Sequence, residues 1–233
     1  MKNWLPQYLP YIRRRPLSSR TLSLSPPAVL ALGFAGLILL GALLLSLPAA
    51  TTAPLNLLQA LFTATSAVTV TGLVVVDTGT HFTLFGQLVI AALIQAGGLG
   101  FMTFAVVAVI SLGAKIGLTQ QKIAQEAMSQ TSLAQVVQIA KAVLLYSVVI
   151  ELAGILLLTL TWYRELGLAT ASWHAVFYTI SAFNNAGFAL SSDSLMPYAG
   201  NIAVNMIISS LFIIGGIGFT VLIDLKKQQR WRL

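Results

Sequence analysis

Four long apolar runs determine what this chain can fold into. They cover residues 28–47, 82–113, 142–163 and 202–223, and a bilayer is crossed by about 20 residues of helix. Inside lipid every backbone polar group needs a partner within the protein, so runs of this length fold as helices. The sequence therefore predicts an all-α membrane protein, in agreement with 57% hydrophobic and only 8% charged residues.

The basic residues lie beside these runs and predict their orientation. Lys and Arg occur in segment 1–27, in the linker 114–141 and in segment 226–233, whereas Arg164 lies at the opposite end of a run. By the positive-inside rule we expect four spans in the cell membrane, with both termini and the linker cytoplasmic. The basic residues behind the net charge of +7 are therefore interpreted as determinants of membrane topology or as contacts to the lipid bilayer. No nucleic acid is expected as a partner.

A shorter apolar segment follows the first run. Pro54 to Val68 has helical character and opens with a proline suited to a first turn, but it is too short to cross a bilayer. The extended stretch after it contains an isolated glycine, Gly72. Such a glycine usually marks a bend or a close approach of the backbone to another group.

The second half of the chain repeats this pattern. QALFTATSAVTVTGL, Gln59 to Leu73, aligns without a gap with HAVFYTISAFNNAGF, His174 to Phe188, so that Gly72 matches Gly187. Further on, GGLGF in the second run matches GGIGF in the fourth. The unit of span, short helix, glycine-bearing segment and span is thus used twice. An even number of spans separates the copies, which predicts parallel repeats.

Two irregular segments at matching depth indicate a pore. Irregular backbone within a membrane is tolerated only where protein buries it or water lines it. A short helix that dips into the membrane directs its C-terminal carbonyl groups, the negative end of its dipole, toward the midplane. The sequence therefore favours a cation path.

Four motifs in fixed order carry a resemblance to a known family. SAVTVTGLVVVDTGTHFTLFGQ, IQAGGLGFMTF, SAFNNAGF and FIIGGIGF resemble the Trk/Ktr/HKT superfamily of potassium transporters, most closely its Ktr membrane subunits. The resemblance covers most of the chain. It implies a potassium-channel-like architecture, in which each repeat consists of a membrane helix, a re-entrant pore helix, a filter loop and a second membrane helix.

The resemblance also implies the ion-binding residues. Backbone carbonyl groups of the filter would replace the hydration shell of potassium, and glycine permits the dihedral angles that turn them toward an axis. Potassium is then the transported ion, with sodium as an alternative, and neither a cofactor nor a catalytic residue is expected. The filter residues that follow are Thr69, Val70, Thr71, Gly72, Asn184, Asn185, Ala186 and Gly187.

The resulting organisation has two repeats. Repeat 1 covers residues 28–113, with span 28–47, pore helix 54–68, filter 69–73 and span 82–113. Repeat 2 covers residues 142–225, with span 142–163, pore helix 173–183, filter 184–188 and span 202–223.

The family carries four repeats in one chain, whereas two are counted here. Two strands do not ring an ion by themselves, so we expect either a longer protein, which we favour, or two copies that complete one pore. The resemblance further implies a homodimeric membrane part and a cytoplasmic nucleotide-binding ring that regulates it.

The sequence leaves two interpretations open for several polar residues and for the motif glycines. Asp77 and Asp193 either concentrate cations at the mouth of the pore or are loop residues, solvated or bonded to the backbone that exits the filter. Glu151 lies inside the third run, where it serves either an ion or proton role or a hydrogen bond to a neighbouring span. His81 and His174 fit an interfacial position. The glycines of GGLGF and GGIGF allow close helix contact or loosen the helix that lines the pore.

The function predicted is potassium uptake through a selectivity filter, as the membrane subunit of a Ktr/Trk-type system. A sodium-permeable relative and a non-conducting membrane scaffold are the alternatives. An enzyme is not expected, because cysteine is absent from the sequence and no nucleophile and base are paired at one depth.

Overall fold

The computed structural model describes residues 26–100 and 133–217, and every regular element within these two ranges is a helix. The all-α prediction is therefore confirmed for this part of the chain. Three of the predicted segments lie wholly or mostly outside the described residues, namely 1–27, 114–141 and 226–233. The ends of the predicted spans 82–113 and 202–223 also lie outside them. The elements are α1 (Pro26–Leu45), α2 (Leu57–Val68), α3 (Thr78–His81), α4 (Leu84–Gly98), α7 (Leu133–Leu166), α8 (Leu168–Phe183), the 3-10 helix η1 (Met196–Tyr198) and α9 (Ile202–Ile217).

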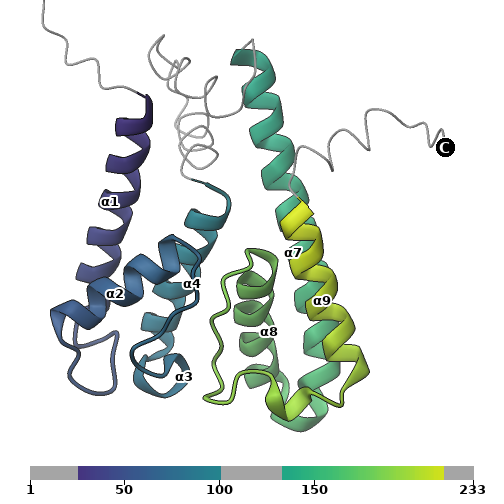
Figure 1. Ribbon diagram of the computed structural model, residues 1–233. Coiled ribbons are helices and arrows are strands. Elements are labelled where there is room, and N and C mark those ends of the chain that lie inside the picture. Colours follow the sequence, from purple (N-terminus) through teal and green to yellow (C-terminus); the bar gives the residue numbers. More distant parts are fainter. Residues whose placement is uncertain (1–25, 101–132, 218–233) are drawn as a thin grey trace, which may run out of the picture.

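The helices form two groups that meet between α4 and α8 (Figure 1). In the first group α1, α2 and α4 contact one another, and in the second group α7, α8 and α9 do the same. Helices α2 and α8, which precede the two glycine-bearing loops and are called the short helices below, each lie against the other two helices of their own group. Each short helix leads into a loop on the side that faces the other group, so both loops lie near the boundary between the groups.

The start of α2 is fixed by a capping box at Asn56. The Asn56 side chain accepts a hydrogen bond from the Leu58 amide at 2.6 Å, and the Gln59 side chain accepts one from the Asn56 amide at 2.9 Å. Each bond satisfies a donor that the first turn leaves free. The helix consequently begins at Leu57, three residues after the proline that the sequence suggested as its first turn.

Helix α4 ends inside the glycine motif. The amide of Leu99 still bonds to the Gln95 carbonyl at 3.1 Å, but Gly100 has a φ of +76°, a common way for a helix to end. The predicted span 82–113 is thus helical from Leu84 to Gly98, and residues 101–113 lie outside the described part. Gly215 and Gly216, which match Gly97 and Gly98, lie within α9, and Gly218, which matches Gly100, lies outside the described residues.

Helices α7 and α8 are joined through a single residue, Gly167. Its φ of +75° belongs to the left-handed region that glycine adopts without a steric penalty, so the chain turns sharply there. Helix α7 contains 34 residues and extends beyond the predicted span 142–163 at both ends. Helix α8 begins at Leu168, earlier than the predicted residue 173.

The outer surface of the longest helix is apolar. Leu152, Leu156 and Leu160 of α7 are 59%, 60% and 58% exposed, and a row of exposed leucines is unfavourable in water but suits lipid. Residues 141–166 form the one helix of the described ranges that is both long and apolar enough to cross a membrane. The apolar stretches of the other helices are shorter, for example Leu84–Gly98 and Ile202–Ile217.

Candidate ion path

The two short helices end in the same way. In α2 the amides of Thr69 and Thr71 bond to the carbonyl groups of Thr65 and Ser66, at 2.8 and 3.0 Å. In α8 the matching amides of Asn184 and Ala186 bond to Ile180 and Ser181, at 3.1 and 2.7 Å. The aligned sequences therefore adopt the same hydrogen-bonded conformation at the point where each predicted filter begins.

The backbone of the two segments is left-handed at the same two positions. Val70 and Asn185 have φ angles of +57° and +58°, and Gly72 and Gly187 have φ angles of +75° and +72°. Glycine adopts this region freely, whereas a β-branched residue such as valine rarely does. Strained backbone of this kind clusters at functional sites.

The two segments approach each other at their glycines. A methyl group on Gly72 would overlap the carbonyl oxygen of Ala186, and one on Gly187 would lie 3.6 Å from the Cα atom of Gly72. The group that the Gly72 backbone approaches in this structure is therefore the backbone of the second segment. The backbones of two loops that are more than a hundred residues apart in the sequence are thereby brought into contact.

The polar side chains of the first segment turn back toward their own helix. The Thr69 hydroxyl donates to the carbonyl of Thr65 at 2.7 Å, and the Thr71 hydroxyl donates to Oγ of Ser66 at 3.0 Å. These bonds occupy both hydroxyl protons within the loop and the end of α2. Backbone carbonyl groups and hydroxyl oxygens, which keep their lone pairs, are the polar atoms that this segment can offer to a cation.

The two asparagines of the second segment have different surroundings. Asn184 points into the protein and donates to Gln95 Oε1 at 2.8 Å and to the Ile180 carbonyl at 2.9 Å. Asn185 is exposed, and its amide lies 3.5 Å from the carbonyl oxygen of Phe183. The Asn184 side chain is thus held within the helix packing.

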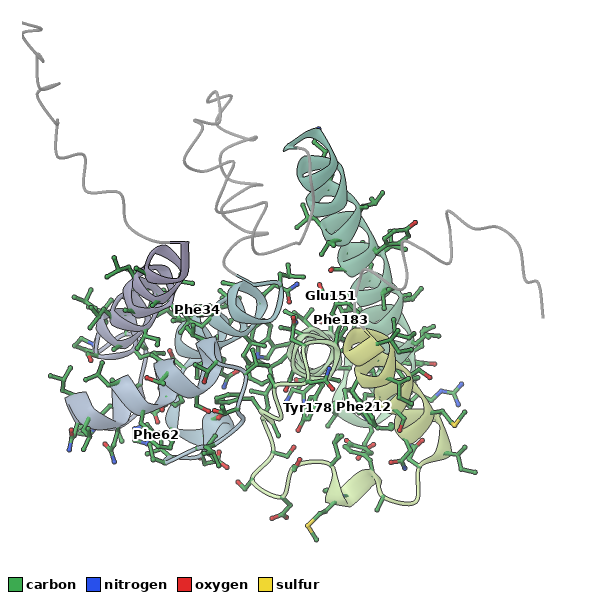
Figure 2. All side chains as sticks on the ribbon, turned by 45° about the horizontal axis from the view of Figure 1, so that its top comes forward. Phe34, Phe62, Glu151, Tyr178, Phe183 and Phe212 are labelled. Carbon is green, nitrogen blue, oxygen red and sulfur yellow. The ribbon has the colours of Figure 1, made fainter. Side chains whose placement is uncertain are left out.

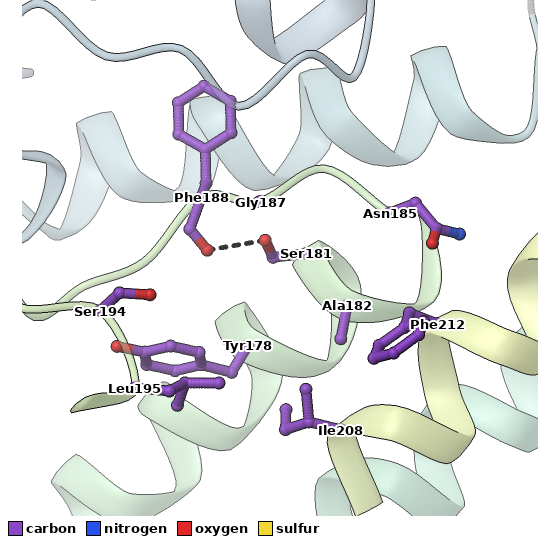
Figure 3. A pocket seen from close by; sticks show the side chains of 10 residues that line it. All are labelled: Tyr178, Ser181, Ala182, Asn185, Gly187, Phe188, Ser194, Leu195, Ile208 and Phe212. Atoms are coloured by element: carbon purple, nitrogen blue, oxygen red, sulfur yellow. Dashed lines mark hydrogen bonds between the residues drawn. The ribbon is translucent and has the colours of Figure 1, made fainter. Parts of the chain in front are cut away.

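A pocket of about 250 Å³ lies beside the second segment (Figure 3). The Ser181 hydroxyl donates to the Phe188 carbonyl at 2.6 Å and so closes the loop behind Gly187. Asn185 lies at one end of the pocket, close to Phe212 of α9. The lining residues are Tyr178, Ser181, Ala182, Asn185, Gly187, Phe188, Ser194, Leu195, Ile208 and Phe212.

The second pair of glycine motifs contacts the ends of the short helices. A methyl group on Gly97 would overlap the carbonyl oxygen of Val68, and one on Gly215 would overlap that of Phe183. Both glycines thus allow close helix contact at equivalent places. Helix α4 also ends within the first motif, whereas the role of the motif in a pore stays a prediction. The phenylalanines of the motifs, Phe101 and Phe219, lie outside the described residues.

The remaining candidate residues are the aspartates of the two loops and the histidines. Asp77 caps α3 and accepts hydrogen bonds from the amide and hydroxyl of Thr80, both at 2.8 Å, whereas Asp193 is exposed. His174 packs its ring against Tyr178. Residues 26–100 and 133–217 contain no group of three His, Cys, Asp or Glu side chains that could hold a metal ion.

Asp77 is held in its charged form by its neighbours. Partial burial raises the pKa of this carboxyl, but hydrogen bonds from the side chains of Thr80 and Ser192 and from the amides of Thr80 and Gly79 lower it by more. The pKa of Asp77 consequently lies below its ordinary value. Of its two interpretations, the structure supports the one in which the aspartate bonds to backbone in a loop.

Glu151 lies among the side chains between α4 and α7 (Figure 2) and is only 9% exposed. Its carboxylate accepts a hydrogen bond from Gln95 Nε2 at 2.8 Å, which is the bond to a neighbouring span that the sequence left as an alternative. Sequence reasoning missed Gln95 and also Gln87, which accepts a bond from the Trp173 indole at 2.7 Å. The signal that could have identified both glutamines is that each is a polar residue within the apolar run 82–113.

Comparisons with known proteins agree with these observations. A family model described as TrkH, cation transport protein, matches residues 36–232. The chain is 53% identical over 208 residues to the Ktr system potassium uptake protein B of Bacillus subtilis. The aligned residues make up 89% of this chain and 47% of that protein. It is 43% identical to the protein of the same name from Vibrio alginolyticus, over 88% of this chain and 45% of that protein.

The name of a further relative includes both potassium and sodium. The potassium/sodium uptake protein NtpJ of Enterococcus hirae is 37% identical over 209 residues, which make up 89% of this chain and 46% of that protein. The chain thus spans about half the length of each of these relatives.

Proposed function

The chain belongs to the TrkH family of cation transport proteins, and we propose that it carries potassium across the cell membrane through a filter made of backbone carbonyl groups. Relatives that share up to 53% of its residues are named potassium uptake proteins. The function is transport and not catalysis.

The observation that carries this proposal is the matching geometry of the two loops. Gly72 and Gly187 follow helices of the same kind, have φ angles of +75° and +72°, and lie against each other. A potassium filter needs carbonyl groups from several segments directed at one axis. Left-handed glycines in two closely approaching loops support such an arrangement.

The helix ends add an electrostatic contribution. The C-terminal ends of α2 and α8 carry the negative ends of the helix dipoles, and each segment begins at such an end. A cation at the meeting point of the segments would therefore be stabilised before any side chain contributes. This supports a re-entrant pore helix in each of two parallel repeats, with the filters at 69–73 and 184–188.

The surroundings of the filter belong to the same proposal. We place both termini and the linker in the cytoplasm, as the distribution of Lys and Arg indicates. Two segments do not enclose an ion, so two further ones complete the ring; either a second copy or further sequence of the same protein would supply them. A homodimer regulated by a cytoplasmic nucleotide-binding ring is proposed from the family resemblance, and the phrase "Ktr system" in the relatives' names supports further components.

Sodium is the alternative ion, because one relative is named a potassium/sodium uptake protein. The test is to reconstitute the complete protein into lipid vesicles and to measure potassium and sodium uptake against protein-free vesicles. We expect potassium uptake to exceed sodium uptake. Equal uptake of both ions would favour the sodium-permeable alternative, and no uptake of either would favour the non-conducting scaffold.

A further inference from the structure

Three polar side chains form one chain of hydrogen bonds where the two helix groups meet. Asn184 Nδ2 donates to Gln95 Oε1, and Gln95 Nε2 donates to Glu151 Oε1, each at 2.8 Å. The residues come from the end of α8, from α4 and from the middle of α7, respectively. A membrane span is thereby connected to the first residue of the second filter segment through two hydrogen bonds.

The space for this connection is created by a glycine. A methyl group on Gly98 would overlap the Asn184 side chain, so this carboxamide lies directly on the backbone of α4. It also bonds back to the Ile180 carbonyl of its own helix at 2.9 Å. Asn184 is therefore held from two sides, immediately before the left-handed residue Asn185.

The first helix group provides an internal comparison for this arrangement. A methyl group on Gly41 of α1 would meet Leu93 and Ala64, and one on Gly154 of α7 would meet Leu211 and Thr179. Leu93 and Leu211 lie four residues before Gly97 and Gly215, which contact the ends of the two short helices. The two groups are thus packed alike, and Gly41 and Gly154 are equivalent positions.

The residues at the equivalent positions of the repeat are Ile38, Ile213 and Thr69, of which two are apolar. Glu151 corresponds to Ile38, and Gln95 corresponds to Ile213. Asn184 corresponds to Thr69, whose hydroxyl bonds within its own helix end. The repeated packing therefore does not require these polar side chains. They occur only where α4 of one group meets α8 of the other.

A buried carboxylate within a span is costly, and such residues usually serve a function. Resting on the proposed function, we propose that Glu151 is a positioning residue for the ion path. Through Gln95 it fixes Asn184, and Asn184 fixes the conformation of Asn185 to Gly187. Helix α7 thereby sets the ion preference of the second filter segment without touching the ion.

The test uses the complete protein in lipid vesicles and four variants. Glu151→Ala and Gln95→Leu each break the chain, whereas Glu151→Gln keeps an oxygen that accepts the bond from Gln95. The double variant Glu151→Ile with Gln95→Ile introduces the isoleucines that stand at the equivalent positions, Ile38 and Ile213. It leaves no buried carboxylate without a partner, so it is expected to fold even if the single variants do not.

A matched control removes a different hydrogen bond between the same groups. Gln87 of α4 accepts a bond from the Trp173 indole at 2.7 Å and donates to the Phe82 carbonyl at 3.0 Å. Gln87→Leu therefore weakens the contact between α4 and α8 at the N-terminal ends of both helices, away from the filter. It is expected to lower thermal stability and to keep the ratio of potassium to sodium uptake.

We expect Glu151→Ala, Gln95→Leu and the double variant to lower the potassium-to-sodium uptake ratio by about fivefold, as the loss of one hydrogen bond would produce. They should raise the half-saturating potassium concentration more than they lower the maximal rate, and Glu151→Gln should restore the ratio. An unchanged ratio in the double variant would overturn the positioning role. So would a Glu151→Gln protein that resembles Glu151→Ala, since the charge would then matter. An unmodified protein without potassium uptake overturns the proposed function itself.

Discussion

Gly72 and Gly187 lie against each other with no room for a side chain on Gly72. The carbonyl oxygen of Ala186 occupies the place that a Cβ atom of Gly72 would take, whereas a Cβ atom on Gly187 would lie at an ordinary 3.6 Å from the Gly72 Cα atom. The two glycines have nearly equal φ angles. They are therefore equivalent in conformation but not in the space around them.

This difference predicts unequal costs for the same substitution. Gly187→Ala should lower the free energy of unfolding by about 1–2 kcal/mol, the cost of a left-handed alanine, whereas Gly72→Ala should lower it further because of the overlap with Ala186. Gly167→Ala is the control, since Gly167 has a φ of +75° with nothing within 4 Å of its Cβ position. Thermal unfolding in detergent measures all three. Equal losses at Gly72 and Gly167 would contradict the close approach.

The glycines of GGLGF and GGIGF should differ from an unpacked helix glycine in the effect of an alanine substitution on stability. Gly97→Ala and Gly215→Ala should each destabilise the protein, because the added methyl group overlaps a carbonyl oxygen at the end of a short helix. Gly36→Ala should stabilise α1 by about 0.5–1 kcal/mol, since alanine favours a helix interior and no atom lies within 4 Å there. Unfolding midpoints of the three variants provide the comparison. Stabilisation by Gly97→Ala would refute the contact.

The loop after Gly187 depends on the Ser181 hydroxyl. Ser181→Ala leaves the Phe188 carbonyl without the donor that now lies at 2.6 Å, and we expect a loss of about 1–3 kcal/mol in unfolding free energy. Ser172→Ala removes an exposed bond to the Ala169 carbonyl in the same helix and should change the stability by less than about 0.5 kcal/mol. Denaturant titration distinguishes the two, and similar small losses would count against a closed loop.

Asp77 predicts a pH dependence of stability. Because its pKa is lower in the folded protein than in the unfolded chain, the carboxylate stabilises the fold above the unfolded pKa of about 3.9. This contribution is lost as the pH falls through the folded pKa. Asp77→Asn should therefore be less stable than the unmodified protein at pH 6, and the difference should shrink below about pH 4. A constant difference across this range would show that the charge of Asp77 has no part.

The elements of this fold could be predicted because they leave local signals. Apolar length indicates spans, and a gap-free internal alignment placed Gly72 and Gly187 at equivalent points, where the structure has matching φ angles. The left-handed conformation of Val70 was not predictable. A β-branched residue disfavours it, so it must be imposed by the packing of the loop on its helix.

The connection through Gln95 was beyond sequence reasoning for a different reason. Its two hydrogen bonds join residues that are 56 and 89 positions apart, and no periodicity indicates which polar residues of two spans will meet. Gln95 itself was visible as a polar residue in an apolar run, but its partners were not. The first residues of α2 and α8, Leu57 and Leu168, differ from the predicted residues 54 and 173. They are set by a capping box at Asn56 and by the left-handed Gly167, respectively.

The most direct measurement is the potassium-to-sodium uptake ratio of the Gly187→Ser variant in the complete protein. Gly187 is preferred to Gly72 because its Cβ position has space, so that the substitution mainly disturbs the backbone conformation. Gly167→Ser, at the same φ outside the ion path, is the control. We predict that Gly187→Ser loses the preference for potassium while Gly167→Ser keeps it. A Gly187→Ser protein with an unchanged ratio would contradict the assignment of the two glycine segments as the filter.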